Sequence, residues 1–115
     1  MRQRPTAIGY LRTDVSGVSQ AWDEIQIRSR AMRLGYELAK TVTFGAHTDS
    51  PLSRLLNVVR QMDVDAVITP NLEHLGGNVP AELVRMCEIN TVTPPETYPP
   101  PMPFRFVDVN EPETC

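Results

Sequence analysis

Short apolar segments alternate with segments of helical periodicity along the first 93 residues. Residues 7–11 and 66–69 are apolar runs, which is the pattern of strands buried on both faces. Between them, residues 36–44 alternate apolar with polar side chains, as a half-exposed strand does. The chain between successive strands is long enough for the helical return that parallel neighbours need. The sequence therefore predicts a three-layer α/β fold, a mainly parallel sheet with helices on both faces.

The segments between the strands carry the signals of helices. In residues 18–34 the apolar side chains that recur at helical spacing are Val18, Trp22, Ile25 and Met32. Gly35 marks the end of this helix, and we expect its apolar face, including Trp22, to be buried. A second helix is expected over residues 51–62 and a shorter third one over residues 78–87. A fourth strand is expected over residues 91–93.

The last 22 residues differ in composition from the rest of the chain. Seven of the eleven prolines follow Thr93, and proline sustains neither a helix nor a central strand. These residues also carry the whole net charge of -3, because residues 1–93 hold ten basic and ten acidic side chains. We therefore divide the chain into a domain over residues 1–93 and a proline-rich acidic tail over residues 94–115. Phe104 and Phe106 lie in an apolar patch of this tail, which either folds back onto the domain or meets a partner.

The overall charge and the cysteine content limit the class of protein. A net charge of -3 provides no whole-chain positive field that would steer the protein onto DNA or an anionic membrane. No apolar run approaches the roughly 20 residues needed to span a bilayer, and no signal-peptide pattern follows Met1. Cys87 and Cys115 are too few for a disulfide framework and are expected to be free thiols. We expect a cytoplasmic protein without a membrane partner.

The loops that follow the strands hold the candidate functional residues. In open parallel sheets, ligands bind beyond the carboxyl ends of the strands, which here are followed by residues 12–17, 45–50 and 70–78. The candidate side chains in these loops are Arg12, Asp14, Ser16, His47, Glu73 and His74. The two histidines lack ligand spacing to Cys87, and no glycine-rich phosphate loop is present, so we expect no metal and no cofactor.

The motifs of these loops resemble the catalytic domain of the serine recombinases, the resolvase and invertase family. The likeness covers residues 6–93 and rests on residues 10–17 (Tyr-Leu-Arg-Thr-Asp-Val-Ser-Gly), 22–26, 44–46 and 71–77 (Asn-Leu-Glu-His-Leu-Gly-Gly). In that family a serine two residues after the strand-end arginine attacks a DNA phosphodiester, and further arginines hold the scissile phosphate. This chemistry needs a nucleophile and several guanidinium donors, because charge develops on the phosphoryl oxygens.

The catalytic positions of that family are altered in this chain. Arg12 matches the first arginine, but Asp14 stands where the nucleophile belongs. His74 and Gly77 occupy the positions of two arginines, and residues 46–50 lack the arginine of the mobile loop. The resemblance therefore implies a degenerate, non-catalytic domain that binds a protein partner. Any contact with DNA is expected to be weak, and a homodimer is one oligomeric state that fits this hypothesis. The residues expected to form its interaction surface are Arg12, Asp14, His47 and His74 on the rim of the site and Phe104 and Phe106 in the tail.

Alternatives to this hypothesis stay open. The loop from Arg12 to Gln26 is longer than in the family, which lets Ser16 serve as nucleophile, with Arg12 as phosphate clamp and Glu73 as orienting carboxylate. A further alternative is a small-anion or nucleotide site at the start of the first long helix, where backbone N–H groups and the helix dipole favour negative charge. A structural interpretation of Arg12 is an ion pair with Asp14 or Glu73 that holds two loops together.

Overall fold

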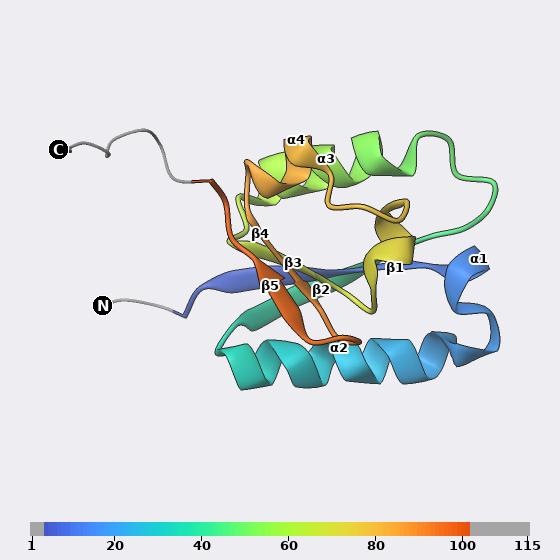
Figure 1. Ribbon diagram of the computed structural model, residues 1–115, viewed down its shortest axis with the longest axis horizontal. Coiled ribbons are helices and arrows are strands. Elements are labelled where there is room, and N and C mark those ends of the chain that lie inside the picture. Colours follow the sequence, from blue (N-terminus) through green and yellow to red (C-terminus); the bar gives the residue numbers. More distant parts are fainter. Residues whose placement is uncertain (1–3, 102–115) are drawn as a thin grey trace, which may run out of the picture.

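The computed structural model describes residues 4–101. Its central layer is a sheet whose strands, in spatial order, are β2 (Glu37–Phe44), β1 (Thr6–Arg12), β3 (Ala66–Thr69), β4 (Glu88–Thr91) and β5 (Glu96–Tyr98) (Figure 1). The first four of these are parallel, and β5 is antiparallel to β4. The helix α2 (Gln20–Leu34) covers one face, and α3 (Pro51–Met62) and α4 (Ala81–Val84) cover the other. The predicted three-layer α/β fold is confirmed.

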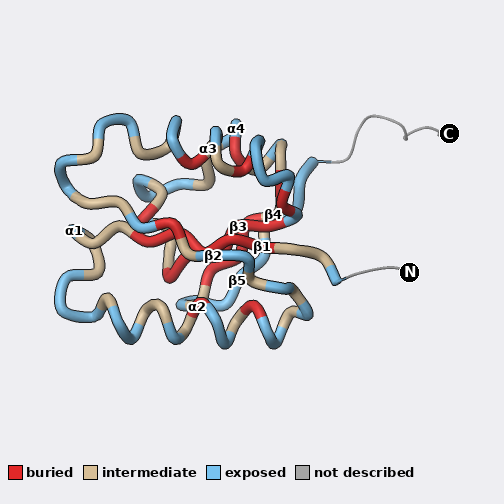
Figure 2. The backbone as a smooth tube through the Cα atoms, turned by 180° about the vertical axis from the view of Figure 1, so that it is seen from behind, coloured by how far each residue is buried: buried red, intermediate tan, exposed pale blue. Residues whose placement is uncertain are grey.

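Each face of the sheet has its own apolar core, and Figure 2 shows buried residues concentrated in the strands. The core beneath α3 and α4 contains Ile8, Tyr10, Val42, Leu55, Val59, Val64, Val67, Leu83, Cys87 and Ile89. The core beneath α2 contains Ala7, Leu11, Ile27, Ala31, Ala66 and Ile68. Alternate residues of β1 enter opposite cores, which is why this strand is apolar at every position between Thr6 and Arg12.

The extent of α2 was predicted correctly, but the face that it buries was not. The helix ends at Leu34, and the following Gly35 adopts a left-handed φ of 83°. Its buried residues are Ile27 and Ala31, whereas Trp22 is 59% and Met32 71% exposed. The prediction that Trp22 belongs to the core is therefore wrong. The helix is apolar on two opposite sides, and the side that carries Ile27 fits closely against the sheet because Gly9 has no side chain there.

The predictions for the segment after β3 are wrong in their boundaries. The short helix does not begin at Asn78, because α4 follows Pro80 and ends before Cys87. The strand β4 begins at Glu88, ahead of the predicted residues 91–93. Polar side chains conceal this strand in the sequence. Asn90 is buried, but its side-chain oxygen accepts a hydrogen bond of 2.6 Å from the Thr97 hydroxyl.

The sheet continues past Thr93 into the proline-rich segment. In β5, Tyr98 lies opposite Ile89 of β4, and the position of β5 at the edge agrees with the exclusion of proline from central strands. Cys87 is a buried free thiol, and burial raises its pKa to about 12. Phe104, Phe106 and Cys115 lie outside the described residues, as does the predicted fold-back of the apolar patch. Within residues 4–101 no helix is long and apolar enough to cross a membrane.

Candidate functional site

Three loops meet at the carboxyl edge of the parallel strands. The loop after β1 forms α1 (Thr13–Ser16) and the 3-10 turn η1 (Gly17–Ser19), and the loop after β3 forms the 3-10 turn η2 (Leu72–Leu75). A cavity of about 330 Å³ opens between the end of β1, the start of α3 and η2. The residues that line it are Tyr10, Arg12, Ser50, Pro51, Leu52, Ser53, His74, Leu75 and Gly76. It therefore lies at the sheet edge where the sequence predicts ligand binding.

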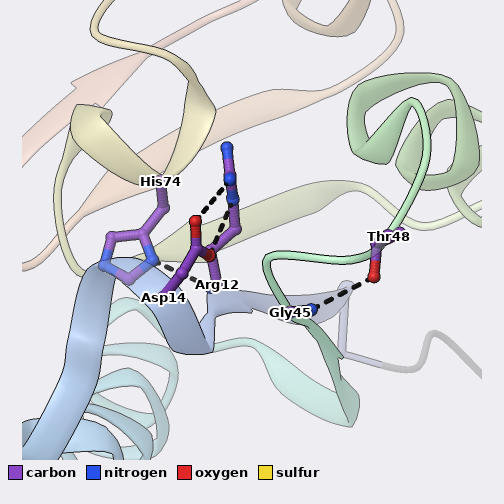
Figure 3. A network of polar contacts seen from close by, with 5 residues as sticks. All are labelled: Arg12, Asp14, Gly45, Thr48 and His74. Carbon is purple, nitrogen blue, oxygen red and sulfur yellow. Dashed lines mark hydrogen bonds and ion pairs between the residues drawn. The ribbon is translucent and has the colours of Figure 1, made fainter.

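His74 joins η2 to the end of β1 (Figure 3). The backbone N–H of Arg12 donates to Nδ1 of His74 at 2.9 Å, and His74 is only 2% exposed. Burial lowers the pKa of His74, although the carboxylate of Asp23 acts in the opposite direction. An Nδ1 atom that accepts a hydrogen bond carries no proton. The neutral imidazole is therefore the form that holds η2 against β1.

Arg12 and Asp14 form a two-pronged ion pair beside the cavity (Figure 3). Nε of Arg12 donates to Oδ1 of Asp14 at 3.2 Å, and Nη2 donates to Oδ2 at 2.6 Å. The hydrogen bond from Arg12 lowers the pKa of the Asp14 carboxyl. Of the two carboxylates considered as partners of Arg12, Asp14 is the one that pairs with it. The charge of this guanidinium is therefore balanced within its own loop.

Ser16 contacts the following helix. Its hydroxyl donates to Oδ2 of Asp23 at 2.6 Å, which links the end of α1 to α2. Ser16 is not among the residues that line the cavity. Sequence reasoning missed Asp23 as its partner, because the contact depends on the turn η1 that brings the two residues together.

The remaining candidates lie apart from the cavity. His47 is exposed in the turn after β2, where the Gly45 N–H donates to the Thr48 hydroxyl at 3.1 Å (Figure 3). Glu73 is exposed on η2, and its backbone N–H donates to the side chain of Asn71 at 3.0 Å. Arg12, Asp14 and His74 thus come together, while His47 and Glu73 do not line the cavity.

The start of α3 contributes residues to this site beyond the predicted loop 45–50. Ser50, Pro51, Leu52 and Ser53 line the cavity. Ser50 precedes the helix in a left-handed conformation with φ of 48°, and no side chain caps the helix. The positive end of the helix dipole therefore lies beside Arg12 at the cavity. The Ser50-Pro51 pair signals a helix start in the sequence, but it does not show which loops that start faces.

The chemical character of the cavity comes from Arg12, the neutral imidazole of His74 and the start of α3. Of these three, the uncapped start of α3 is the feature that favours a group with negative charge, because Asp14 already balances the charge of Arg12. Among residues 4–101, no group of three His, Cys, Asp or Glu side chains is placed to hold a metal ion. The chain matches no protein-family model, no curated protein and no solved structure.

Proposed function

We propose that this chain is a serine-recombinase-like domain that has lost phosphoryl transfer and acts by binding a protein partner. The observation that carries the proposal is the ion pair between Arg12 and Asp14. A carboxylate stands at the nucleophile position of the resemblance and engages the guanidinium that would hold a phosphate. Phosphoryl transfer needs a free nucleophile and free positive donors, so this arrangement supports binding over catalysis.

The rim of the cavity is the surface that we assign to the partner. Arg12 and Asp14 are partly exposed there, and His47 lies exposed on the neighbouring loop. His74 is buried, so its part is to position the end of β1 and not to touch a partner. The net charge of -3 favours a protein partner over DNA, because no excess of positive charge offsets the repulsion from phosphates.

The first test is for catalysis on DNA. We expect no covalent protein–DNA adduct when the protein is incubated with supercoiled plasmid and resolved on a denaturing gel. We also expect no tight, salt-sensitive binding of a labelled duplex by fluorescence anisotropy at two salt concentrations. An adduct that wild type forms and Ser16→Ala does not would overturn the proposal. The domain would then be a recombinase with Ser16 as nucleophile, Arg12 as clamp and Glu73 as orienting carboxylate.

The same proposal predicts which variants lose the partner. Affinity capture with the tagged full chain, quantified by mass spectrometry, is expected to recover proteins that the double variant Arg12→Ala, Asp14→Ala no longer retains. Glu82→Ala, an exposed change on α4 away from the cavity, serves as the matched control and is expected to retain them. Retention of every specific protein by the rim variant would contradict the assigned surface.

A second candidate function is binding of a small anion or nucleotide in the same cavity, at the start of α3 instead of α2. The cavity of about 330 Å³ and the uncapped start of α3 beside Arg12 favour it. Inorganic phosphate or nucleotides are then expected to raise the unfolding midpoint. At a ligand concentration a hundred times Kd, the free energy of unfolding is expected to rise by about 2.7 kcal/mol. Ser53→Asp places a carboxylate at this helix start and is expected to abolish the gain. A midpoint that no member of the panel changes would exclude this function.

A further inference from the structure

The side of α2 that points away from the sheet carries exposed apolar side chains. Within residues 4–101, five large apolar side chains are exposed, and four of them lie on α2 or in the turn η1 just before it: Val18, Trp22, Ile25 and Met32. In Figure 1, α2 is the outermost layer on its side of the sheet, and Figure 2 shows exposed residues along that outer side. We call these four residues, together with the exposed Ser29, the outer face of α2. An apolar face left open along a helix marks an interaction surface.

The spacing of the outer face is that of a seam between two helices. From Val18 to Met32 its five positions follow one another at intervals of four, three, four and three residues. This is the repeat with which paired helices insert their side chains between one another. The buried residues of α2, Ile27 and Ala31, belong to the core against the sheet. The sheet therefore stands behind the outer face and leaves it open to a second helix.

The side chains of the outer face complement one another when two copies of α2 run antiparallel. When Ile25 of each copy lies opposite Ser29 of the other, Trp22 lies opposite Met32. A branched side chain then meets a small one, and an indole ring meets a thioether, which is a favourable contact. In a parallel pairing each side chain meets its own copy, so that two tryptophans face each other and two serines leave a gap. The shape of the face therefore fits a second copy in the antiparallel direction.

The charges beside the outer face favour the same direction. Glu24 and Arg28 are four residues apart and lie on the same flank of α2. In the antiparallel pair, Arg28 of each copy is level with Glu24 of the other to within about 3 Å along the helix axis. Within residues 4–101 the ion pair present is that of Arg12 with Asp14, so both charges are available to a second copy. A parallel pairing would instead bring like charges to the same level.

We propose that two copies of this chain associate through the outer face of α2, antiparallel and about a twofold axis that passes between Ile25 and Ser29. Such an interface is isologous, so that each contact occurs twice. Burial of the apolar side chains drives the association, and the pairs of Glu24 with Arg28 set its direction. No residue that lines the cavity at the carboxyl edge takes part, so the association is independent of the proposed function.

Sedimentation velocity of the full chain under reducing conditions, over a range of concentrations, tests this association. We expect the mass to rise from that of one chain towards that of two. Ile25→Glu brings a carboxylate into the apolar contact and is expected to weaken association at least about tenfold. Ile25 is exposed in the single chain, so circular dichroism is expected to show an unchanged fold. Met62→Ser, at the fifth exposed apolar side chain, on α3, is the matched control and is expected to associate as wild type does.

An exchange of charges tests the direction of the two helices. Glu24→Arg places two arginines level with each other and is expected to weaken association about fivefold. The double variant Glu24→Arg, Arg28→Glu restores opposite charges between the copies and is expected to recover most of the loss. Equal association of wild type and both variants would contradict the assigned direction.

Disulfide cross-linking in a Cys115→Ser background, where Cys87 is buried, measures the register. On mild oxidation, a mixture of Ile25→Cys and Ser29→Cys chains is expected to cross-link. Met32→Cys alone is expected not to, because its two copies lie about 15 Å apart along the axis. Cross-linking of Met32→Cys to itself would show a parallel pair and overturn the proposal.

Two further outcomes separate this association from the proposed function. The rim variant Arg12→Ala, Asp14→Ala is expected to dimerise as wild type does, whatever proteins it fails to capture. A wild-type chain that stays monomeric at every concentration would rule out the second copy. If Ile25→Glu then also lost a captured protein, that protein would be the occupant of the outer face instead.

Discussion

Replacement of His74 by alanine is expected to lower the free energy of unfolding by about 3 kcal/mol. Two losses add in this variant. The buried imidazole leaves a cavity in the packing, and the backbone N–H of Arg12 loses the Nδ1 atom that accepts its hydrogen bond at 2.9 Å. In a domain of this size, that loss lowers the unfolding midpoint by roughly 15 °C. Urea denaturation and calorimetry of the full chain measure both quantities.

The other histidine of the chain is the matched control. His47 is exposed, so His47→Ala is expected to change stability by no more than about 0.5 kcal/mol. His74→Asn supplies a side-chain oxygen as acceptor and is expected to recover part of the loss. Equal losses in the two alanine variants would show that the contact between His74 and Arg12 contributes nothing specific.

His74 also gives the stability a pH dependence. Because burial lowers its pKa in the folded protein, the unfolded chain takes up the proton first as the pH falls. Stability is therefore expected to decrease below about pH 6.5 and to level off below the lowered folded pKa. Asp14, whose pKa is also lowered, adds its effect only as the pH falls below about 4. Between pH 7 and 5, His74→Asn is expected to flatten the dependence, and an unchanged slope would contradict this assignment.

Gly9→Ala is expected to cost about 2–3 kcal/mol of stability, because the added methyl group enters a filled space. A Cβ atom at this position would lie 2.8 Å from Cγ2 of Ile27 and 2.8 Å from Oγ1 of Thr41. Ile27 belongs to α2 and is fully buried between the helix and the sheet, so relief requires α2 to move away from the sheet. Chemical denaturation of the variant measures the cost directly.

A second glycine and a double variant test that explanation. Gly45→Ala meets only the Thr13 hydroxyl, at 3.2 Å, and is expected to cost less than about 1 kcal/mol. Ile27→Ala in the Gly9→Ala background removes the clashing methyl group, so the double variant is expected to lose less stability than the sum of the two single variants. Additive losses would mean that the contact between these two side chains is not the source of the cost.

The elements whose burial pattern is distinctive could be predicted from the sequence. The apolar run of β1 and the proline-started α3 have one consistent interpretation, and both were predicted. The orientation of α2 was not, because periodicity locates Trp22 and Ile27 on opposite sides of the helix without showing which side meets a sheet. The fourth strand was predicted too late in the chain, over residues 91–93, because the buried Asn90 of β4 is satisfied by Thr97, a residue that only the sheet brings near.

The same limit applies to the candidate site. The ion pair of Arg12 with Asp14 was among the predicted alternatives, because the two residues are close in sequence. The acceptor role of His74 is different, since it lies 62 positions from Arg12 and depends on the conformation of η2. The contribution of the start of α3 likewise arises only when the loops meet at the sheet edge. Contacts between distant loops are thus what the sequence pattern leaves out.

The two borders of the sheet bear on how the protein behaves at high concentration. Unpaired strand edges can recruit further strands and so begin aggregates. On one side β5 is only three residues long and is followed by Pro99, Pro100 and Pro101, which have no N–H to offer a neighbouring strand. On the other side β2 carries exposed Glu37 and Lys40, and charged side chains on an edge strand oppose its pairing with the edge of a second sheet. Both edges of the sheet are therefore protected against the addition of strands from another molecule.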